Sequence, residues 1–414
     1  MDAERTRPWV IVGGGLTGAK AATTLRKEGF DGRLVVVAAE AHEPYERPAL
    51  SKDYLRGEIK ADKLLAAEPE FWSGADTELL LGRRAVAIDF DRRQVELEGG
   101  RPLPFGRLLI ATGSSPVRPA IPGALASFVH TLRTIEDSDR LRIAAASATQ
   151  VAVAGGGWIS AEVAASLRQM GHDVTLVVPT AEVLEHRLGP EVGAIYSGLH
   201  ERNGVRIVRG APVVEVVDDG RRRGLLLSNG DFVPADLVVL GFGATPNVEL
   251  AGSLELSADG GILVDAELRT ATPEVFAAGD VASAWHPRYG RNLRVEHWDN
   301  ARQQGRVAAL NMLGRGVPYD RVPYFYSDQF DLGMETFGLP GDAGEVAVRR
   351  WDDGGRFVAL WLVDGRAVAG VHGNDFDESK TLQRLVREQI RVDVHRFGDA
   401  SVPLSDLLPA EQPA

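Results

Sequence analysis

The chain has 414 residues, of which 44% are hydrophobic and 25% are charged, as in an ordinary globular protein of two or three domains. Its formal net charge of -12 argues against a nucleic-acid partner. No apolar run approaches the roughly 20 residues that span a bilayer. Residues 1–5 are charged, unlike a signal peptide, so we expect a cytoplasmic protein with no membrane partner.

The chain contains no cysteine. Structural disulfides and thiolate metal sites are therefore excluded, and we expect no metal centre. Any mechanism that passes electrons through a dithiol or a sulfenic acid is excluded as well.

The N-terminal segment predicts a first dinucleotide site. An apolar strand over 9–12 precedes a G-x-G-x-x-G motif over 13–18, and a helix is predicted over 16–27. The glycines allow a tight turn and let a pyrophosphate sit on the helix N-terminus. A second strand over 33–39 ends beside an acid that can hold a ribose. The candidate cofactor contacts are Gly13, Gly15, Leu16, Thr17, Gly18 and Glu40.

The same pattern occurs a second time. A strand over 150–154 precedes Gly-Gly-Gly-Trp-Ile-Ser at 155–160, and a helix over 161–169 and a strand over 174–178 follow. Two Rossmann-like units predict two dinucleotides, FAD and a nicotinamide cofactor. Glu162 lies on the first helical turn, where the dipole favours a carboxylate whatever its function. The candidate contacts are Gly155, Gly157, Trp158, Ile159 and Glu162.

The second site departs from the pattern in two ways. Ser160 replaces the third glycine, and Pro179 follows the strand where an acid usually holds the adenosine ribose. Glu182 is nearby but displaced, and the first arginine that could hold a 2′-phosphate is Arg187. We therefore favour NADH as the electron donor and leave NADPH possible.

The segment Phe-Ala-Ala-Gly-Asp-Val-Ala at 276–282 predicts a return of the chain to the flavin. Gly279 lets the backbone approach a ligand, and Asp280 supplies a carboxylate at the end of a strand, where α/β sheets bind ligands. This carboxylate can accept a hydrogen bond from a ribityl hydroxyl. The alternative is an ordinary Gly-Asp turn.

Two further segments carry a family resemblance. Residues 44–52, PYERPALSK, resemble the PYxRPxLSK signature of the ferredoxin reductases that serve bacterial oxygenases and cytochromes P450. Residues 323–331, PYFYSDQFD, resemble the PWFWSDQYD of the same family, with Tyr324 and Tyr326 in place of the tryptophans. The resemblance extends from about residue 9 to 407, nearly the whole chain.

The resemblance implies roles for individual residues. It puts Lys52 beside the isoalloxazine ring and Glu162 near the nicotinamide carboxamide, facing Lys52 across the flavin, and makes both catalytic. It gives Arg47 a flavin-side role and His297 a positioning role. Further cofactor contacts are implied for Val86, Ala111, Thr112, Gly113, Arg133, Gly243 and Trp298.

The implied architecture is α/β and glutathione-reductase-like. It has two Rossmann-like dinucleotide-binding domains and a C-terminal α+β domain. The FAD-binding domain would comprise 1–115 and 244–320, the NAD(P)H-binding domain 116–243 and the C-terminal domain 321–414. In this last domain Asp364-Gly365 predicts a hairpin turn, and we expect 411–414 to be frayed.

The implied activity is hydride transfer from NAD(P)H to FAD, followed by single-electron transfer to a [2Fe-2S] ferredoxin that feeds a P450 or a ring-hydroxylating oxygenase. Residues 288–315 contain six arginines and only two acidic residues. This basic stretch is either a solvated surface or a docking site for an acidic ferredoxin. The protein would be a monomer or a homodimer. The missing cysteines exclude disulfide reductases. The remaining alternatives are a rubredoxin reductase, an NADH oxidase or quinone-type diaphorase, and a redox-sensing flavoprotein of the apoptosis-inducing-factor type.

Overall fold

The structure is a computed structural model that describes residues 7–74, 77–342, 344–351 and 355–409. The expectations for 1–5 and 411–414 lie outside the described residues. The chain forms two compact units. Unit 1 comprises Met1–Pro48, Lys60–Ser115 and Ala244–Arg321, and unit 2 comprises Ala49–Ile59, Pro116–Gly243 and Val322–Ala414. The division into three domains predicted from the sequence stays a prediction.

A five-stranded parallel sheet organises unit 1. Its strands are short, and all except the edge strand over 77–80 are wholly apolar, as expected for a parallel sheet that helices cover. In spatial order they are β19 (Val275–Ala277), β7 (Leu108–Ile110), β1 (Trp9–Val12), β2 (Leu34–Val37) and β3 (Thr77–Leu80).

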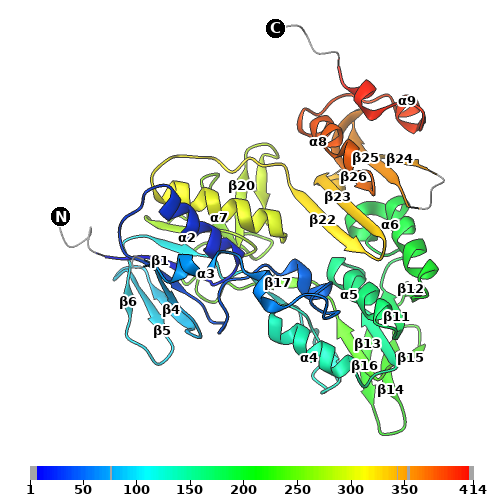
Figure 1. The fold of residues 1–414 in the computed structure, drawn as a ribbon, viewed down its shortest axis with the longest axis horizontal. Helices are drawn as coiled ribbons and strands as arrows, with labels where there is room; N and C mark the ends of the chain where they lie inside the picture. The colour runs from blue at the N-terminus through cyan, green and yellow to red at the C-terminus, as the bar shows by residue number, and fades with distance from the viewer. Residues whose placement is uncertain (1–6, 75–76, 343, 352–354, 410–414) are drawn as a thin grey trace. The chain divides into compact units, whose positions relative to one another are not determined.

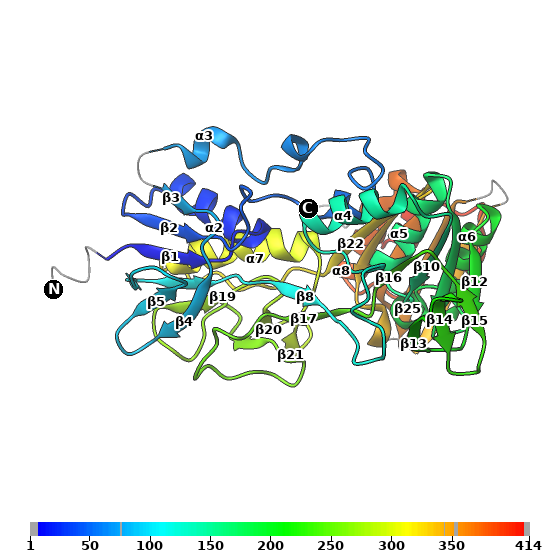
Figure 2. The same ribbon diagram turned by 90° about the horizontal axis from the view of Figure 1, so that it is seen from below.

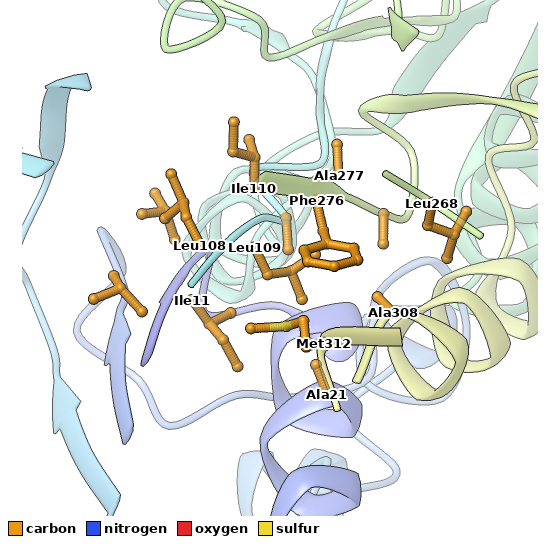
Figure 3. Close-up of a cluster of buried hydrophobic side chains, with 14 of the residues drawn as sticks. Ile11, Ala21, Leu108, Leu109, Ile110, Leu268, Phe276, Ala277, Ala308 and Met312 are labelled. Atoms are coloured by element: carbon orange, nitrogen blue, oxygen red, sulfur yellow. The ribbon is translucent and has the colours of Figure 1, made fainter. Parts of the chain in front are cut away.

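Two helices, α2 (Leu16–Lys27) and α7 (Trp298–Met312), lie side by side against this sheet (Figure 1). The core between the sheet and these helices contains Ile11, Leu109 and Phe276 from three strands. Ala308 and Met312 of α7 face these side chains (Figure 3). At Gly305 the helices approach so closely that a Cβ would lie 2.4 Å from the Thr17 carbonyl oxygen. This contact joins the first and last parts of unit 1.

Besides a 3₁₀ helix over Ala61–Leu64, the smaller elements of unit 1 in the described part of the chain are one short α-helix and three small sheets. These are α3 (Pro69–Trp72); β4 (Ala85–Asp89), β5 (Gln94–Leu97) and β6 (Leu103–Pro104); β18 (Ile262–Val264), β20 (Ala282–His286) and β21 (Arg291–Leu293); and the pair β8 (Ser114–Pro116) and β17 (Ala244–Pro246).

Unit 2 contains a second five-stranded parallel sheet. Its strand order is β12 (Arg206–Arg209), β11 (Asp173–Val178), β10 (Gln150–Ala154), β16 (Leu237–Leu240) and β9 (Val129–His130). Figure 2 shows α5 (Trp158–Gln169) along this sheet, near α4 (Ile135–Ala145) and α6 (Glu185–Arg202). A small antiparallel sheet is formed by β13 (Val213–Asp218), β14 (Arg223–Leu227) and β15 (Phe232–Pro234).

The C-terminal part of unit 2 is an antiparallel sheet with two helices. The sheet has the order β22 (Tyr324–Gln329), β23 (Leu332–Gly338), β26 (Arg366–Gly373), β25 (Phe357–Val363) and β24 (Glu345–Arg350); the helices are α8 (Ser379–Arg387) and α9 (Val394–Gly398). The predicted turn between β25 and β26 is confirmed, because Asp364 and Gly365 both have positive φ, 49° and 70°.

These elements confirm the predicted fold class, with two Rossmann-like sheets and a C-terminal α+β part. Among the described residues, no helix is both long enough and apolar enough to cross a membrane.

Candidate functional site

The loop after β1 forms a cradle that only glycine allows. Gly13 has a φ of +131°, and a Cβ there would lie 2.1 Å from the Ala111 carbonyl oxygen. At Gly18 a Cβ would lie 2.1 Å from the Gly13 carbonyl oxygen. Gly15 is the N-cap of α2 and provides no capping side chain. The first amides of the helix therefore keep their donors for an anion such as a pyrophosphate.

The late segment 276–282 reaches the same cradle. Gly279 has a φ of +81°, a Cβ there would lie 2.4 Å from Thr17 Oγ1, and its amide donates to Gln304 Oε1 at 2.8 Å. Asp280 is 8% exposed, and its Oδ2 accepts from Ser114 Oγ at 2.9 Å. Unit 1 thus brings together Gly13, Thr17, Gly279 and Asp280 as the motifs suggest. Sequence reasoning missed Gln304 and Ser114.

Glu40 and Arg47, both predicted as cofactor contacts, form an ion pair of 2.7 Å in unit 1. Tyr45 joins them: its hydroxyl donates to Glu40 Oε2 and accepts from Arg47 Nη1 at 3.0 Å. Burial would lower the pKa of Arg47, but Tyr45 and Glu40 outweigh it and hold the pKa above its usual value. The pair keeps a fixed cation and a fixed anion in the loop after β2.

The other predicted contacts of unit 1 are spread over several elements. Thr112 lies between Ala111 and Gly113 and forms two hydrogen bonds with Asn247. Its Oγ1 donates to the Asn247 carbonyl oxygen at 2.7 Å, and its own carbonyl oxygen accepts from Asn247 Nδ2 at 2.9 Å. Val86 is 49% exposed on β4. His297 caps α7, its Nδ1 accepting from the Asp299 amide at 3.3 Å, and Trp298 begins that helix under the Arg302 guanidinium. Capping explains His297 without any cofactor.

The second glycine loop, in unit 2, repeats the first. Gly155 has a φ of +126°, and a Cβ there would lie 2.2 Å from the Gly241 carbonyl oxygen. Gly157 is the N-cap of α5 and again supplies no capping side chain. Ser160 Oγ donates to the Gly241 carbonyl oxygen at 3.3 Å, and a Cβ on Gly241 would meet that hydroxyl at 2.1 Å. A glycine opposite the loop therefore accommodates the serine that replaces the third motif glycine.

Four other predicted contacts also belong to unit 2. Trp158 packs edge-on against Tyr196, with ring centroids 6.3 Å apart, and Ile159 is 45% exposed. Gly243 has a φ of +90° directly before the chain re-enters unit 1. The amide of Arg133 donates to Asp137 Oδ2 at 2.9 Å, just before α4.

Lys52 and Glu162 form a buried ion pair in unit 2. Lys52 Nζ lies 3.3 Å from Glu162 Oε1, and their side chains are 10% and 6% exposed. Ser327 Oγ donates to Oε1 at 2.7 Å, and Ser51 Oγ donates to Oε2. Lys52 Nζ also lies 5.4 Å from the ring centroid of Tyr326. The expectation that the two charges face each other across a flavin ring is replaced by direct contact, because two charges this buried require each other as partners.

Unit 2 contains three more buried polar side chains on the elements β22 and α6. Gln329 follows Ser327 on β22, and His200 and Tyr196 come from α6; each is at most 1% exposed. Burial lowers the pKa of His200 to about 4 and raises the pKa of Tyr196. Sequence reasoning missed all three. Gln329 lies within the PYFYSDQFD segment, which is the only sequence signal for it.

The chain matches two known protein families. Residues 7–305 match the pyridine nucleotide-disulphide oxidoreductase family and residues 324–408 match the reductase C-terminal family. The chain belongs to the pyridine nucleotide-disulphide oxidoreductases. Because it has no cysteine, it lacks the thiols that the family name suggests.

Individual relatives cover nearly the full length. The biphenyl dioxygenase system ferredoxin–NAD(+) reductase component of Paraburkholderia xenovorans is 36% identical over 402 residues, 97% of this chain and 98% of that protein. A ferredoxin reductase for the CYP199A2 system from Rhodopseudomonas palustris has a TM-score of 0.91 and 32% identity, covering 96% of this chain and 99% of that one. The structure of a covalent putidaredoxin reductase–putidaredoxin complex has a TM-score of 0.90 and 33% sequence identity, covering 97% of this chain and 98% of that one.

The depressed pKa of His200 predicts an acid-sensitive step in stability. The unfolded chain binds a proton at this imidazole near pH 6.5, whereas the folded protein binds it only near pH 4. The contribution of the neutral imidazole to the free energy of unfolding is therefore present above pH 6.5 and is lost as the pH falls toward 4. The loss between pH 7 and pH 5 is about 2 kcal/mol. Urea unfolding of the wild type and of His200→Gln at both pH values measures this. Equal losses in the two proteins would contradict it.

Proposed function

We propose that the protein is a flavoprotein reductase that passes electrons from NADH through FAD to a small ferredoxin. The observation that carries this is the pair of glycine-cradled, uncapped helix N-termini of α2 and α5 in a chain without cysteine. Two such sites suit two dinucleotides. Since no thiol is available, electrons that reach the flavin must leave it directly for a partner.

The residues of unit 1 fit FAD. A Cβ at Gly13, Gly18 or Gly279 would clash with protein atoms, so the tight loop that presents the α2 amides to a ligand's phosphates requires glycine at these positions. We assign the α2 amides to the pyrophosphate, Asp280 to a ribityl hydroxyl and Glu40 to the adenosine ribose, with Arg47 holding the Glu40 carboxylate in place. Bound FAD would supply the capacity to take up a hydride and release electrons one at a time. The other cofactor assignments stay predictions.

The residues of unit 2 fit NADH and its alignment. We assign the second glycine loop to the NADH pyrophosphate and Glu162 to the nicotinamide carboxamide. Lys52 then provides a positive charge beside the flavin, held in place by Glu162. Such fixed charges act by orientation and electrostatics, because hydride transfer itself needs no side-chain nucleophile.

The partner would be an acidic [2Fe-2S] ferredoxin. The relatives are named for ferredoxin reduction, which favours this reading over the oxidase, rubredoxin and redox-sensing alternatives. In unit 1, Arg302 and Arg306 are exposed one turn apart on α7, where they could steer an acidic protein. Arg294 is less suited, since its side chain is 16% exposed and pairs with Glu296. A cytoplasmic location stays a prediction, which cell fractionation would test.

Anaerobic stopped-flow reduction of the purified flavoprotein tests the function. We expect NADH to bleach the flavin absorbance rapidly and NADPH to do so more slowly, because no arginine follows β11 directly to hold a 2′-phosphate. The reduced protein should then reduce cytochrome c only when a ferredoxin is added. Slow bleaching by both donors would contradict the proposal, as would reduction of cytochrome c without a ferredoxin.

Asp280→Ala should weaken FAD binding about tenfold, the loss expected for a hydrogen bond to a charged group. Flavin fluorescence during titration of the apoprotein measures the affinity. Asp259→Ala is the matched control, because Asp259 also accepts from a serine in unit 1, Ser283, but is exposed. Equal affinity of the wild type and Asp280→Ala would remove Asp280 from the site.

Lys52→Met should slow flavin reduction roughly ten- to a hundredfold and leave the FAD content unchanged. The methionine keeps the length of the side chain but removes its charge. Because this also leaves Glu162 buried without a cation, the double variant with Glu162→Gln separates the two effects. Lys20→Met, at a half-buried lysine of unit 1, is the control. An unchanged limiting rate in Lys52→Met would refute the flavin-side assignment.

A further inference from the structure

A continuous chain of buried hydrogen bonds leads away from the Lys52–Glu162 pair within unit 2. Glu162 Oε1 accepts from Ser327 Oγ at 2.7 Å. Ser327 Oγ accepts from Gln329 Nε2 at 3.1 Å, and Gln329 Oε1 lies 2.9 Å from His200 Nε2. These four side chains come from α5, β22 and α6, and all four residues are buried. Solvent therefore cannot replace any bond of the chain.

The chain can have one of two directions. In the first, His200 Nε2–H donates to Gln329, the Gln329 amide donates to Ser327, and Ser327 donates to an ionised Glu162. In the second, a protonated Glu162 donates to Ser327 and every later bond reverses. The imidazole then carries its proton on Nδ1. Each direction is thus tied to one charge state of Glu162.

The surroundings favour the first direction at both ends. His200 Nδ1 is buried and has no hydrogen-bond partner among the described residues. A proton on it would be a buried donor left unsatisfied, which costs more than an unused acceptor of a neutral ring. At the other end, the Lys52 ammonium lies 3.3 Å from Oε1, the oxygen that would carry the proton in the second direction, and its charge favours an ionised carboxylate.

The chain is not a route for protons. Gln329 has no proton that it can readily release, and the chain ends at a fully buried imidazole. Packing fixes that end: the His200 ring lies edge-on to Phe330, with centroids 5.3 Å apart. Phe330 has a φ of +56°, a strained value for a bulky residue that the surrounding structure must impose. Such a rigid, closed chain orients a group rather than transferring charge.

We propose that Ser327, Gln329 and His200 are positioning residues that fix Glu162 as an oriented carboxylate anion and thereby hold Lys52 for hydride transfer. This inference rests on the proposed function, in which Lys52 and Glu162 align the nicotinamide with the flavin. Its own content is the direction of the chain, set by the tautomer of a histidine that touches neither charge.

The first test reads the tautomer without activity. Long-range ¹⁵N–¹H NMR of the oxidised holoprotein labelled in its 9 histidines, with His200 assigned by comparison with His200→Gln, distinguishes Nε2–H from Nδ1–H. We expect a neutral Nε2–H imidazole at pH 7. An Nδ1–H tautomer would overturn the proposal, because it requires the reversed chain.

The second test measures flavin reduction at saturating NADH. Ser327→Ala and Gln329→Met should each lower the limiting rate constant about tenfold, the size expected for one hydrogen bond to a carboxylate, with little change in the Kd of NADH or the FAD content. His200→Gln keeps an N–H donor near the Nε2 position and should retain most of the rate, whereas His200→Leu should lose it. Ser327→Ala removes only one buried oxygen, so the test stands even if another variant fails to fold.

Ser197→Ala is the matched control, since Ser197 is a buried serine of α6 that accepts from the Val183 amide. Its rate should equal that of the wild type. If Lys52→Met and Glu162→Gln slow reduction but Ser327→Ala does not, the inference fails and the proposed function survives. If none of the three slows reduction, the assignment of Lys52 and Glu162 itself is wrong.

Discussion

The constraint on which the candidate site depends is the burial of two opposite charges, Lys52 and Glu162. Neither side chain is more than 10% exposed, and an unpaired charge at that depth would cost several kcal/mol. Coulomb attraction alone does not repay such a loss of hydration, so the remaining lone pairs of the carboxylate need donors. Ser51 and Ser327 provide them. The loop before Lys52 and the strand β22 must therefore pack against α5 in a single arrangement.

The same kind of constraint acts on the backbone in both units. In each unit the first loop glycine lies against a carbonyl directly after the neighbouring strand: Gly13 against Ala111 after β7, and Gly155 against Gly241 after β16. The two sheets also have matching strand orders, β19-β7-β1-β2-β3 in unit 1 and β9-β16-β10-β11-β12 in unit 2. They differ in where the outermost strand beside β7 or β16 lies in the chain: β19 comes after the other four strands of its sheet, whereas β9 comes before the other four of its own. The late position of β19 in the chain brings Asp280 back to a loop formed at residue 13.

Signals confined to neighbouring residues were sufficient to predict the glycine loops, the helices after them and the Asp364-Gly365 turn, because each depends on local backbone geometry. The contacts of Glu162 could not be predicted in that way, since Ser327 is 165 residues away in the chain and His200 is 129 residues from Gln329. Ser160 illustrates the same limit. Considered alone, a serine at this position weakens the match to the glycine motif. The residue that faces it, 81 positions later, is Gly241, which has no Cβ to clash with the serine hydroxyl.

The two tyrosines that replace tryptophans of the family motif have different physical roles. The Tyr324 hydroxyl donates to Glu335 at 2.7 Å, and hydrogen bonds from His372, Ser379 and Tyr324 lower the pKa of that carboxyl to about 2. Tyr324 is thus fixed to β23 by its polar end. Tyr326, by contrast, lies over the Lys52 ammonium. A change of aromatic residue at 326 alters the surroundings of the charged pair. A change at 324 alters only the contact of that residue with β23. Any effect of these replacements on electron transfer to a partner should therefore arise at Tyr326.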